Sequence, residues 1–281
     1  ICHLMWDHDN TRLSPISCKI RVGSACDQFA NVDQHDAHEL LITLIQSFHE
    51  SLSKNVKYRI SGSIVSDLDE QIKKSHDDWI NYYKNKHSVI LDIFSGQLKT
   101  ELICVNCHKM LCRYDPILGI DLPCLPNENI YQCFDHFVET EQLSEDNLYQ
   151  CDFCHEKTRA YKRHSLWKLP NILIVKFSRF QHKIVNGTYQ SEKITGLIAY
   201  PTKDLDLSKY VSSPMVSQSK YDLYAVSCHA GNMSHGHYYS ICFSETKNSW
   251  MHYNDYTIKP MSANYEPIVD DAYILFYKLK N

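Results

Sequence analysis

The sequence lacks an apolar run long enough to cross a bilayer. Its longest purely apolar segments are short, such as 172–175 and 274–276, whereas a membrane-spanning helix needs roughly 20 such residues. A secretory signal peptide is also absent from its start. Positive charge is not in excess, because 29 Lys and Arg residues oppose 33 Asp and Glu residues, for a net charge of −4. We therefore expect no membrane span, and neither nucleic acid nor an anionic membrane as the main partner.

Cysteine is too scarce for a disulfide scaffold. It accounts for 12 of 281 residues, below the ~8–10% typical of such scaffolds. Four of the cysteines form two Cys-x-x-Cys pairs, which favours metal binding over disulfides and a reducing compartment. We expect an intracellular protein, cytoplasmic or, as the alternative, nuclear. Because the sequence begins at Ile1 and not at Met, we also expect a fragment of a longer protein.

Helical periodicity comes first along the chain and strand patterns follow. Apolar residues recur at helical spacing over 37–52, which predicts a helix with Asp33 as its N-cap. A second helix is expected around 69–83. The predicted strands are 98–104, 117–122, 171–180, 221–229, 237–243, 250–254 and 272–279, and 208–219 is expected to be a surface loop. This order of helices and then antiparallel strands indicates an α+β fold.

Four cysteines have the spacing of a metal site. Cys104 and Cys107 form one pair, Cys151 and Cys154 the other, and 43 residues separate the inner members. Each pair lets one turn present two sulfurs, and two such turns complete a tetrahedral thiolate cage. The alternative is two unrelated pairs of buried thiols. Because four sulfurs leave no open coordination position, we predict a structural zinc ion and not a catalytic one.

A histidine and an asparagine are predicted to face each other in a hairpin. If the strands 237–243 and 250–254 pair around a loop centred near 245.5, His237 lies opposite Asn254, within side-chain reach. Asp255 is the other candidate partner, but successive side chains of a strand point to opposite faces, so this register favours Asn254. A histidine held by an amide or carboxylate is the base half of a nucleophilic site. The alternative is a hydrogen-bonded structural histidine.

Two glycines, Gly231 and Gly236, lie close to His237 in the sequence. Glycine permits the close approach of another backbone or of a substrate chain. Their placement therefore favours a functional reading of this histidine.

An ordered set of motifs spans nearly the whole chain. The set comprises QHDAHELL at 34–41, FSGQLK at 94–99, the two Cys pairs, LPNILIVKFSRF at 169–180, GHY at 236–238, Trp250 with YND at 253–255, and AYILFY at 272–277. Taken in this order, these residues resemble the ubiquitin-specific protease family of cysteine deubiquitinases.

The resemblance implies a papain-like arrangement of thumb, palm and zinc-tipped fingers, with the N-terminal part of the thumb missing. Residues 1–281 would then form one truncated catalytic domain. We expect a helical thumb remainder at approximately 1–94, zinc-binding fingers at 95–168 and a β-sheet palm at 169–281.

The resemblance also assigns roles to residues. His237 matches the general base, Asn254 the residue that orients it, and Asp255 a second acidic neighbour, while the four paired cysteines match the zinc ligands of the fingers. Asp36 and Glu39 fall near the site of the ubiquitin tail, whose arginines would pair with acidic residues. The alternative for these two is a capped, solvated helix face.

One family motif is absent from this sequence. The nucleophile of the family sits in a Cys box near Gly-Asn-Thr-Cys-Tyr, and Cys2, Cys26 and Cys228 do not lie in that context. We therefore expect a deubiquitinating thiol protease that cleaves after the C-terminal glycine of ubiquitin, acts on ubiquitinated proteins, and is inactive as this chain alone. The alternatives are a catalytically inactive ubiquitin-binding relative and a zinc-stabilised interaction module.

Overall fold

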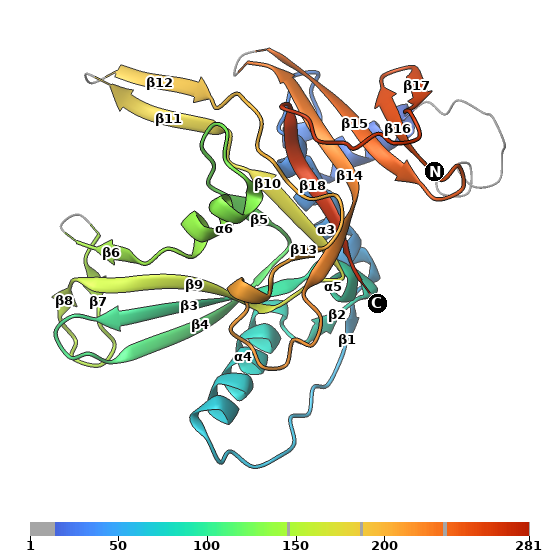
Figure 1. Ribbon diagram of the computed structural model, residues 1–281. Coiled ribbons are helices and arrows are strands. Elements are labelled where there is room, and N and C mark those ends of the chain that lie inside the picture. Colours follow the sequence, from blue (N-terminus) through green and yellow to red (C-terminus); the bar gives the residue numbers. More distant parts are fainter. Residues whose placement is uncertain (1–14, 145–146, 186–187, 233–234, 281) are drawn as a thin grey trace. The chain divides into compact units, whose positions relative to one another are not determined.

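The computed structural model describes residues 15–144, 147–185, 188–232 and 235–280 (Figure 1). The chain forms two compact units, Ile1–Ser51 and Leu52–Asn281, and each is described by itself. Within the described residues, no helix combines the length and the apolar character that a membrane crossing requires.

The first unit is helical. It contains α2 (Ile16–Ala25), the short 3-10 helix η1 (Asp27–Phe29) and nearly all of α3 (Ala37–Leu52). The helix predicted over 37–52 is confirmed, but its predicted cap is wrong. Asp36 Oδ1 accepts the backbone N–H groups of His38 at 2.6 Å and Glu39 at 3.2 Å, whereas the carboxylate of Asp33 accepts from the side chain of Asn31 at 2.6 Å. The cap lies three residues later than predicted, because Asp36 satisfies the free N–H groups of the first turn.

An eight-stranded sheet organises the second unit, in the order β17-β16-β15-β14-β18-β10-β5, with β13 pairing to β14. Its strands are β5 (Ile120–Leu122), β10 (Ile172–Phe177), β13 (Leu205–Asp206), β14 (Lys220–Gly231), β15 (Gly236–Ser244), β16 (Ser249–Asn254), β17 (Thr257–Pro260) and β18 (Ala272–Leu279). The four predicted C-terminal strands are confirmed as β14, β15, β16 and β18. The strand predicted over 171–180 is shorter than expected, because β10 ends at Phe177.

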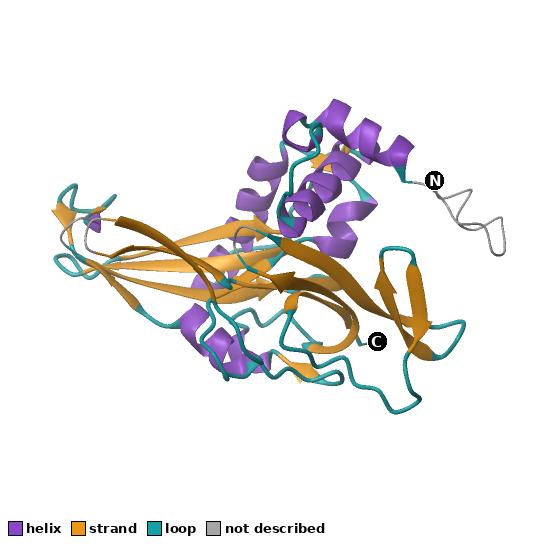
Figure 2. Cartoon of the chain, turned by 90° about the horizontal axis from the view of Figure 1, so that it is seen from above, coloured by secondary structure: helices purple, strands orange, loops and turns teal. Residues whose placement is uncertain are grey.

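A four-stranded sheet, β4-β3-β9-β6, extends away from the eight-stranded one (Figure 1 and Figure 2). Its strands are β3 (Gly96–Cys104), β4 (Met110–Ile117), β6 (Glu141–Leu143) and β9 (Ala160–Lys168). The small pair β7 (Tyr149–Gln150) and β8 (Lys157–Thr158) lies at its far end, and α4 (Asp67–Tyr83) packs against β4 at its near end. One Cys-x-x-Cys turn joins β3 to β4 of this sheet, and the other joins β7 to β8.

The single strand predicted over 117–122 is wrong. Ile117 ends β4 and pairs with Gly96 in the four-stranded sheet. Ile120 starts β5 and pairs in parallel with Val175 of β10 in the other sheet. The chain passes from one sheet to the other between these residues, so one apolar run serves two sheets.

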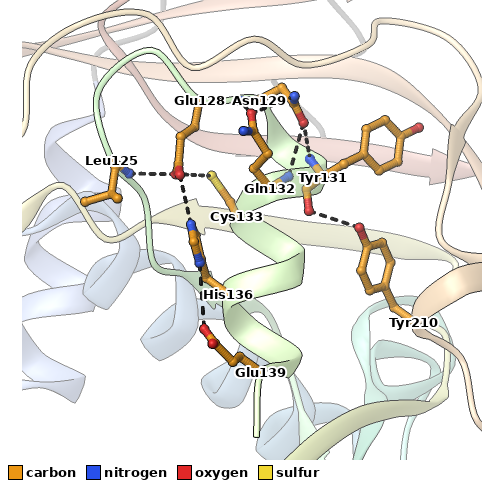
Figure 3. A network of polar contacts seen from close by, with 9 residues as sticks. All are labelled: Leu125, Glu128, Asn129, Tyr131, Gln132, Cys133, His136, Glu139 and Tyr210. Carbon is orange, nitrogen blue, oxygen red and sulfur yellow. Dashed lines mark hydrogen bonds and ion pairs between the residues drawn. The ribbon is translucent and has the colours of Figure 1, made fainter.

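The core of the second unit lies between the eight-stranded sheet and α6 (Ile130–Val138). Asn129 caps this helix by accepting the backbone N–H groups of Tyr131 and Gln132, and the Gln132 side chain accepts from the backbone of Asn129 in return (Figure 3). Ile130 and Phe134 of α6 are fully buried in the apolar cluster. The remaining elements are α5 (Val89–Phe94), the pair β1 (Lys54–Asn55) and β2 (Lys86–His87), and the hairpin of β11 (Phe180–Val185) and β12 (Thr188–Lys193).

The segment 208–219 is not wholly the surface loop that its serines predict. It opens with the 3-10 helix η3 (Ser208–Tyr210), and Tyr210 is buried. The Tyr210 hydroxyl donates to the carbonyl of Tyr131 and to Asp135, both at 3.0 Å. The aromatic ring that interrupts the polar run anchors this segment on α6.

Candidate active site and candidate metal centre

The β15–β16 hairpin carries the predicted His237 and Asn254 pair in a different register from the one expected. The structure pairs Ser240 with Tyr253, whereas the predicted loop centre would pair it with Met251. The turn is four residues long, so the partner of each residue moves by two positions. A shift of two keeps every side chain on its face, whereas a shift of one would reverse all of them.

The predicted contact is confirmed. His237 Nε2 lies 2.8 Å from Asn254 Oδ1. An amide oxygen only accepts, so Nε2 carries the hydrogen and Nδ1 is the basic nitrogen of the neutral ring. The His237 side chain is 48% exposed, which leaves Nδ1 accessible for a reacting group.

Asp255 also faces the histidine, contrary to the expected alternation. Its Oδ2 lies 3.9 Å from His237 Nε2. Strand geometry ends at Asn254, and Asp255 has a left-handed φ of 49° in the tight turn that leads to Thr257. Alternation applies within a strand and not in such a turn, so both residues reach the same ring.

The glycines beside His237 are required by close packing, as the sequence suggested. Gly231 has a φ of 109°, and a Cβ there would collide with the backbone carbonyl of His235. A Cβ on Gly236 would overlap the ring of His229, which is buried and makes an edge contact with Phe180 at 5.3 Å. Both positions therefore admit only glycine without movement of the turn that precedes His237.

Lys193 supports this turn, and the sequence gives no sign of it. Its Nζ donates to the carbonyl oxygens of His229 at 2.6 Å and Gly231 at 3.0 Å. Backbone carbonyls leave no signature in a sequence, so a lysine at the end of β12 looks like any solvated strand residue. Lys193 joins the β11–β12 hairpin to the segment that delivers His237.

Cys228 is unsuited to act as a nucleophile. It pairs with Tyr239 across β14 and β15 and is fully buried. Burial raises the pKa of its thiol to about 12, so it is not a thiolate near neutral pH. This agrees with the expectation of a small buried hydrophobe. Cys2, which lacks the family context, lies outside the described residues.

The four paired cysteines come together at the end of the four-stranded sheet. Their Sγ atoms all lie within 4.8 Å of one another, with 3.9 Å between Cys104 and Cys154 and 3.7 Å between Cys107 and Cys151. Disulfide sulfurs would be about 2.05 Å apart. Four sulfurs at about 2.3 Å from one zinc ion are about 3.8 Å from each other in a tetrahedron. The cluster therefore fits a tetrahedral metal ion.

The two Cys-x-x-Cys turns have the same backbone geometry. Cys104 accepts the N–H of His108 and Cys151 that of His155, each at 3.0 Å, and both histidines adopt a left-handed φ near 60°. The backbone N–H of Cys107 also points at Cys104 Sγ and lowers the pKa of that thiol to about 7. Each turn presents two sulfurs in the way that the spacing predicts.

The two acidic residues of the early helix have structural partners. Asp36 caps α3, and Glu39 accepts a hydrogen bond from the Gln28 side chain at 2.7 Å. These contacts match the capped helix face that was the alternative reading, and they leave a role in ubiquitin binding as a prediction.

Comparisons with known proteins agree on one family. A family model described as "Ubiquitin carboxyl-terminal hydrolase" matches residues 1–277. "Ubiquitin carboxyl-terminal hydrolase 2" of Gallus gallus is 30% identical over 286 residues, which is 99% of this chain and 78% of the relative. The protein of the same description from Homo sapiens is also 30% identical, over 96% of this chain and 44% of the relative. The chain thus spans less than half of the human relative.

Two solved structures of the SAGA Ubp8/Sgf11/Sus1/Sgf73 DUB module share the fold. The one bound to monoubiquitin has a TM-score of 0.70 at 23% identity and covers 95% of this chain and 53% of that chain. The one bound to ubiquitin aldehyde has a TM-score of 0.69 at 24% identity over 95% of this chain and 54% of that chain. The expected α+β, papain-like fold is confirmed. Together with the family match, these findings show that the chain belongs to the ubiquitin carboxyl-terminal hydrolase family of ubiquitin-specific proteases.

Proposed function

We propose that this chain is part of a deubiquitinating thiol protease that cleaves after the C-terminal glycine of ubiquitin. The observation that carries the proposal is the 2.8 Å contact between His237 Nε2 and Asn254 Oδ1. It leaves Nδ1 free to act as the general base of a cysteine protease. Membership of the family supplies the substrate class.

The proposed reaction follows from the geometry of this ring. His237 Nδ1 takes the proton of the cysteine thiol, and the thiolate attacks the carbonyl carbon of the terminal glycine. The imidazolium then returns the proton to the leaving lysine amine, and water hydrolyses the resulting thioester with His237 again as base. Asn254 holds the ring, and the Asp255 carboxylate lies 3.9 Å from the same Nε2.

We also propose that the nucleophile comes from a Cys box outside this sequence, so that the chain alone is inactive. Support comes from the absence of that motif and from the assignment of four cysteines to the metal cluster. The burial of Cys228 removes the thiol that lies on β14, the strand beside the one that begins with the GHY motif.

The metal proposed for the four-cysteine cluster is a structural zinc ion. The Sγ separations suit it, and four thiolates leave no position for a substrate or a reactive water. The ion would hold the β3–β4 turn against the β7–β8 turn. We propose the corresponding division into thumb (1–94), fingers (95–168) and palm (169–281).

Ubiquitin and ubiquitinated proteins are the proposed partners. The structures of the related DUB module are bound to monoubiquitin and to ubiquitin aldehyde. We place Asp36 and Glu39 near the ubiquitin tail, where their carboxylates would pair with its arginines.

Calorimetry of this chain with ubiquitin tests the proposed partner without requiring catalysis. We expect weak binding, and weaker binding when Glu39→Gln removes a charge while keeping a side chain that accepts from Gln28. Asp36→Asn preserves the helix cap and serves the same purpose at the second position. A folded sample that gives no heat at millimolar ubiquitin would contradict the proposal. If this chain binds ubiquitin and the longer protein proves to lack a Cys box, the results would instead favour the alternative of a catalytically inactive ubiquitin-binding relative.

A further inference from the structure

His237 lies where the eight-stranded sheet narrows to two strands. The ladder between β15 and β16 stops at Ser240, and the ladder between β14 and β18 stops at Cys228. Beyond these points, residues 229–231 of β14 and 236–238 of β15 form a ribbon whose ladder pairs, within the described residues, are only with each other. A ribbon of two strands is marginally stable by itself. The position of His237 therefore depends on what else holds this ribbon.

One side of β14 in the ribbon faces the space beyond the start of β18. The N–H and C=O groups of one residue in an antiparallel strand point to the same side, and those of the next residue point to the opposite side. His229 donates its N–H to the carbonyl of Asp271, just before β18, so its own carbonyl points that way too. The carbonyl of Gly231, two residues on, has the same direction. Because the ladder with β18 ends at Cys228, β18 offers these two carbonyls no ladder partner.

Lys193 takes the place of the missing strand. Its Nζ donates to the carbonyls of His229 at 2.6 Å and Gly231 at 3.0 Å. These two residues flank Ala230, which is the ladder partner of His237. Hydrogen bonds from a charged donor are stronger than those between neutral groups. One side chain thus fixes the backbone on both sides of the residue that pairs with His237.

The backbone that carries Lys193 is itself held in the core. The next residue, Ile194, is buried, and its N–H donates to the carbonyl of Arg179 at 2.7 Å. The carbonyl of Ile194 accepts from Arg179 Nη1 at 3.0 Å. Arg179 is buried and also donates from Nε to the carbonyl of Ala272, the first residue of β18. Lys193 therefore connects the end of β14 to a buried, hydrogen-bonded part of the second unit.

We propose that Lys193 is a positioning residue for catalysis by His237, an inference that rests on the proposed function. Asn254 orients the imidazole ring, whereas Lys193 fixes the strand beside the backbone that carries the ring. The hydrogen bonds of Lys193 go to carbonyls of β14 and not to the ring, so it acts through His237 and transfers no proton. Since the place of the ring affects the chemical step, loss of Lys193 lowers kcat and leaves the KM for ubiquitin nearly unchanged.

Amide hydrogen exchange of this chain tests the structural part of the proposal without requiring catalysis. We expect Lys193→Met to speed exchange of the His229 amide about tenfold or more, because the ribbon opens more often. Exchange over 223–227 of the same strand should not change. Lys203→Met is the matched control, because Lys203 also contacts β14, at Asp222 with 3.4 Å between Nζ and Oδ2, but outside the ribbon. Unchanged exchange at His229 in Lys193→Met would overturn the proposal, and so would faster exchange along all of β14.

Steady-state hydrolysis of a fluorogenic ubiquitin conjugate by the complete enzyme tests the catalytic part. We expect Lys193→Met to lower kcat about tenfold or more and to change KM by less than about twofold. Lys193→Arg should recover most of kcat, because a guanidinium group can also donate to two carbonyls. Lys203→Met should keep both constants. Unchanged kcat in a folded Lys193→Met enzyme, or a raised KM with kcat retained, would refute the positioning role.

The variant His237→Ala distinguishes a failure of this role from a failure of the proposed function. If His237→Ala loses turnover while Lys193→Met keeps it, only the role of Lys193 is wrong. If His237→Ala keeps turnover, the proposed function itself is wrong. Should Lys193→Met not fold, Lys193→Gln replaces it, because its side chain is too short to reach both carbonyls, and the same loss of kcat is expected.

Discussion

At the scale of single residues, the His237–Asn254 contact depends more on the face of the strand from which each side chain projects than on the exact register of the two strands. The sequence placed His237 directly opposite Asn254, and the structure displaces the pair by two positions, yet their side chains meet at 2.8 Å. Hairpin loop length is hard to infer from the sequence 244–249, whereas the period of two is robust. Asp255 could not be placed in this way, because its left-handed backbone lies outside the strand.

Substitution of Asn254 should reduce catalysis without abolishing it. We expect Asn254→Ala in the complete enzyme to lower kcat about 10-fold or more, because the ring loses its orienting acceptor but keeps Nδ1. Asn254→Asp should restore much of the rate, because a carboxylate also accepts from Nε2. Steady-state hydrolysis of a fluorogenic ubiquitin conjugate provides kcat. Unaltered kcat in Asn254→Ala would remove the residue from the mechanism.

At the scale of elements, the sequence predicts the features that follow from local residue patterns. It does not predict the features that depend on tertiary contacts. The Cys-x-x-Cys turns and the C-terminal strands follow from spacing and from β-branched and aromatic residues. The bulge at Trp167 and the change of sheet after Ile117 depend on pairing with β3 and β10, which lie far away in the sequence. The role of Lys193 could not be predicted from the sequence either, since its partners are backbone carbonyls of β14.

Loss of one cysteine ligand should release the metal. We expect about one zinc ion per purified chain and little or none in Cys151→Ser, with a lower melting temperature, because metal binding is coupled to the folding of the two turns. Cys112→Ser changes a cysteine of β4 in the same sheet that is not in the cluster and should keep the zinc. Elemental analysis reports both. A metal-free, folded chain with disulfides at these positions would contradict the zinc assignment.

The network at the start of α6 should make stability depend on pH (Figure 3). Glu128 accepts from His136 Nε2 at 2.8 Å and thereby raises the pKa of this histidine, with Glu139 adding to the effect. A raised pKa means that the contribution is fully present below the ordinary value of about 6.5 and is lost as pH rises through the folded-state value.

Urea unfolding of the chain and of His136→Gln across this pH range measures the contribution. We expect the difference in unfolding free energy to be largest at the acidic end and to shrink as pH rises. It will be small at every pH, because the His136 side chain is 40% exposed. In a Glu128→Gln background the difference should vary much less with pH, because only the weaker effect of the other acidic neighbours remains. A gap that grows toward alkaline pH would contradict the assignment.

At the scale of the whole molecule, one ordered set of motifs identifies the family although most of the chain differs from its relatives. Part of this set lies in the buried core. Arg179 of the 169–180 segment is buried and donates to the carbonyls of Ala272, Ile194 and Gly196. Such positions join strands that are distant in the sequence, so their residues identify the fold. The sequence does not predict how these strands assemble into sheets, because the order in which strands pair leaves no local pattern.

The central claim is that His237 is the general base of ubiquitin hydrolysis, and one measurement tests it most directly. The complete enzyme, carrying its Cys box, is compared with His237→Ala and with His252→Ala in the release of a fluorophore from the ubiquitin C-terminus. The ring of His252 contacts that of Tyr239 in the same hairpin, with 5.2 Å between the ring centroids, and His252 serves as the matched control. We predict that His237→Ala lowers kcat by about 10²–10⁴-fold and that His252→Ala has a far smaller effect. Turnover by His237→Ala close to that of the unmodified enzyme would contradict the account.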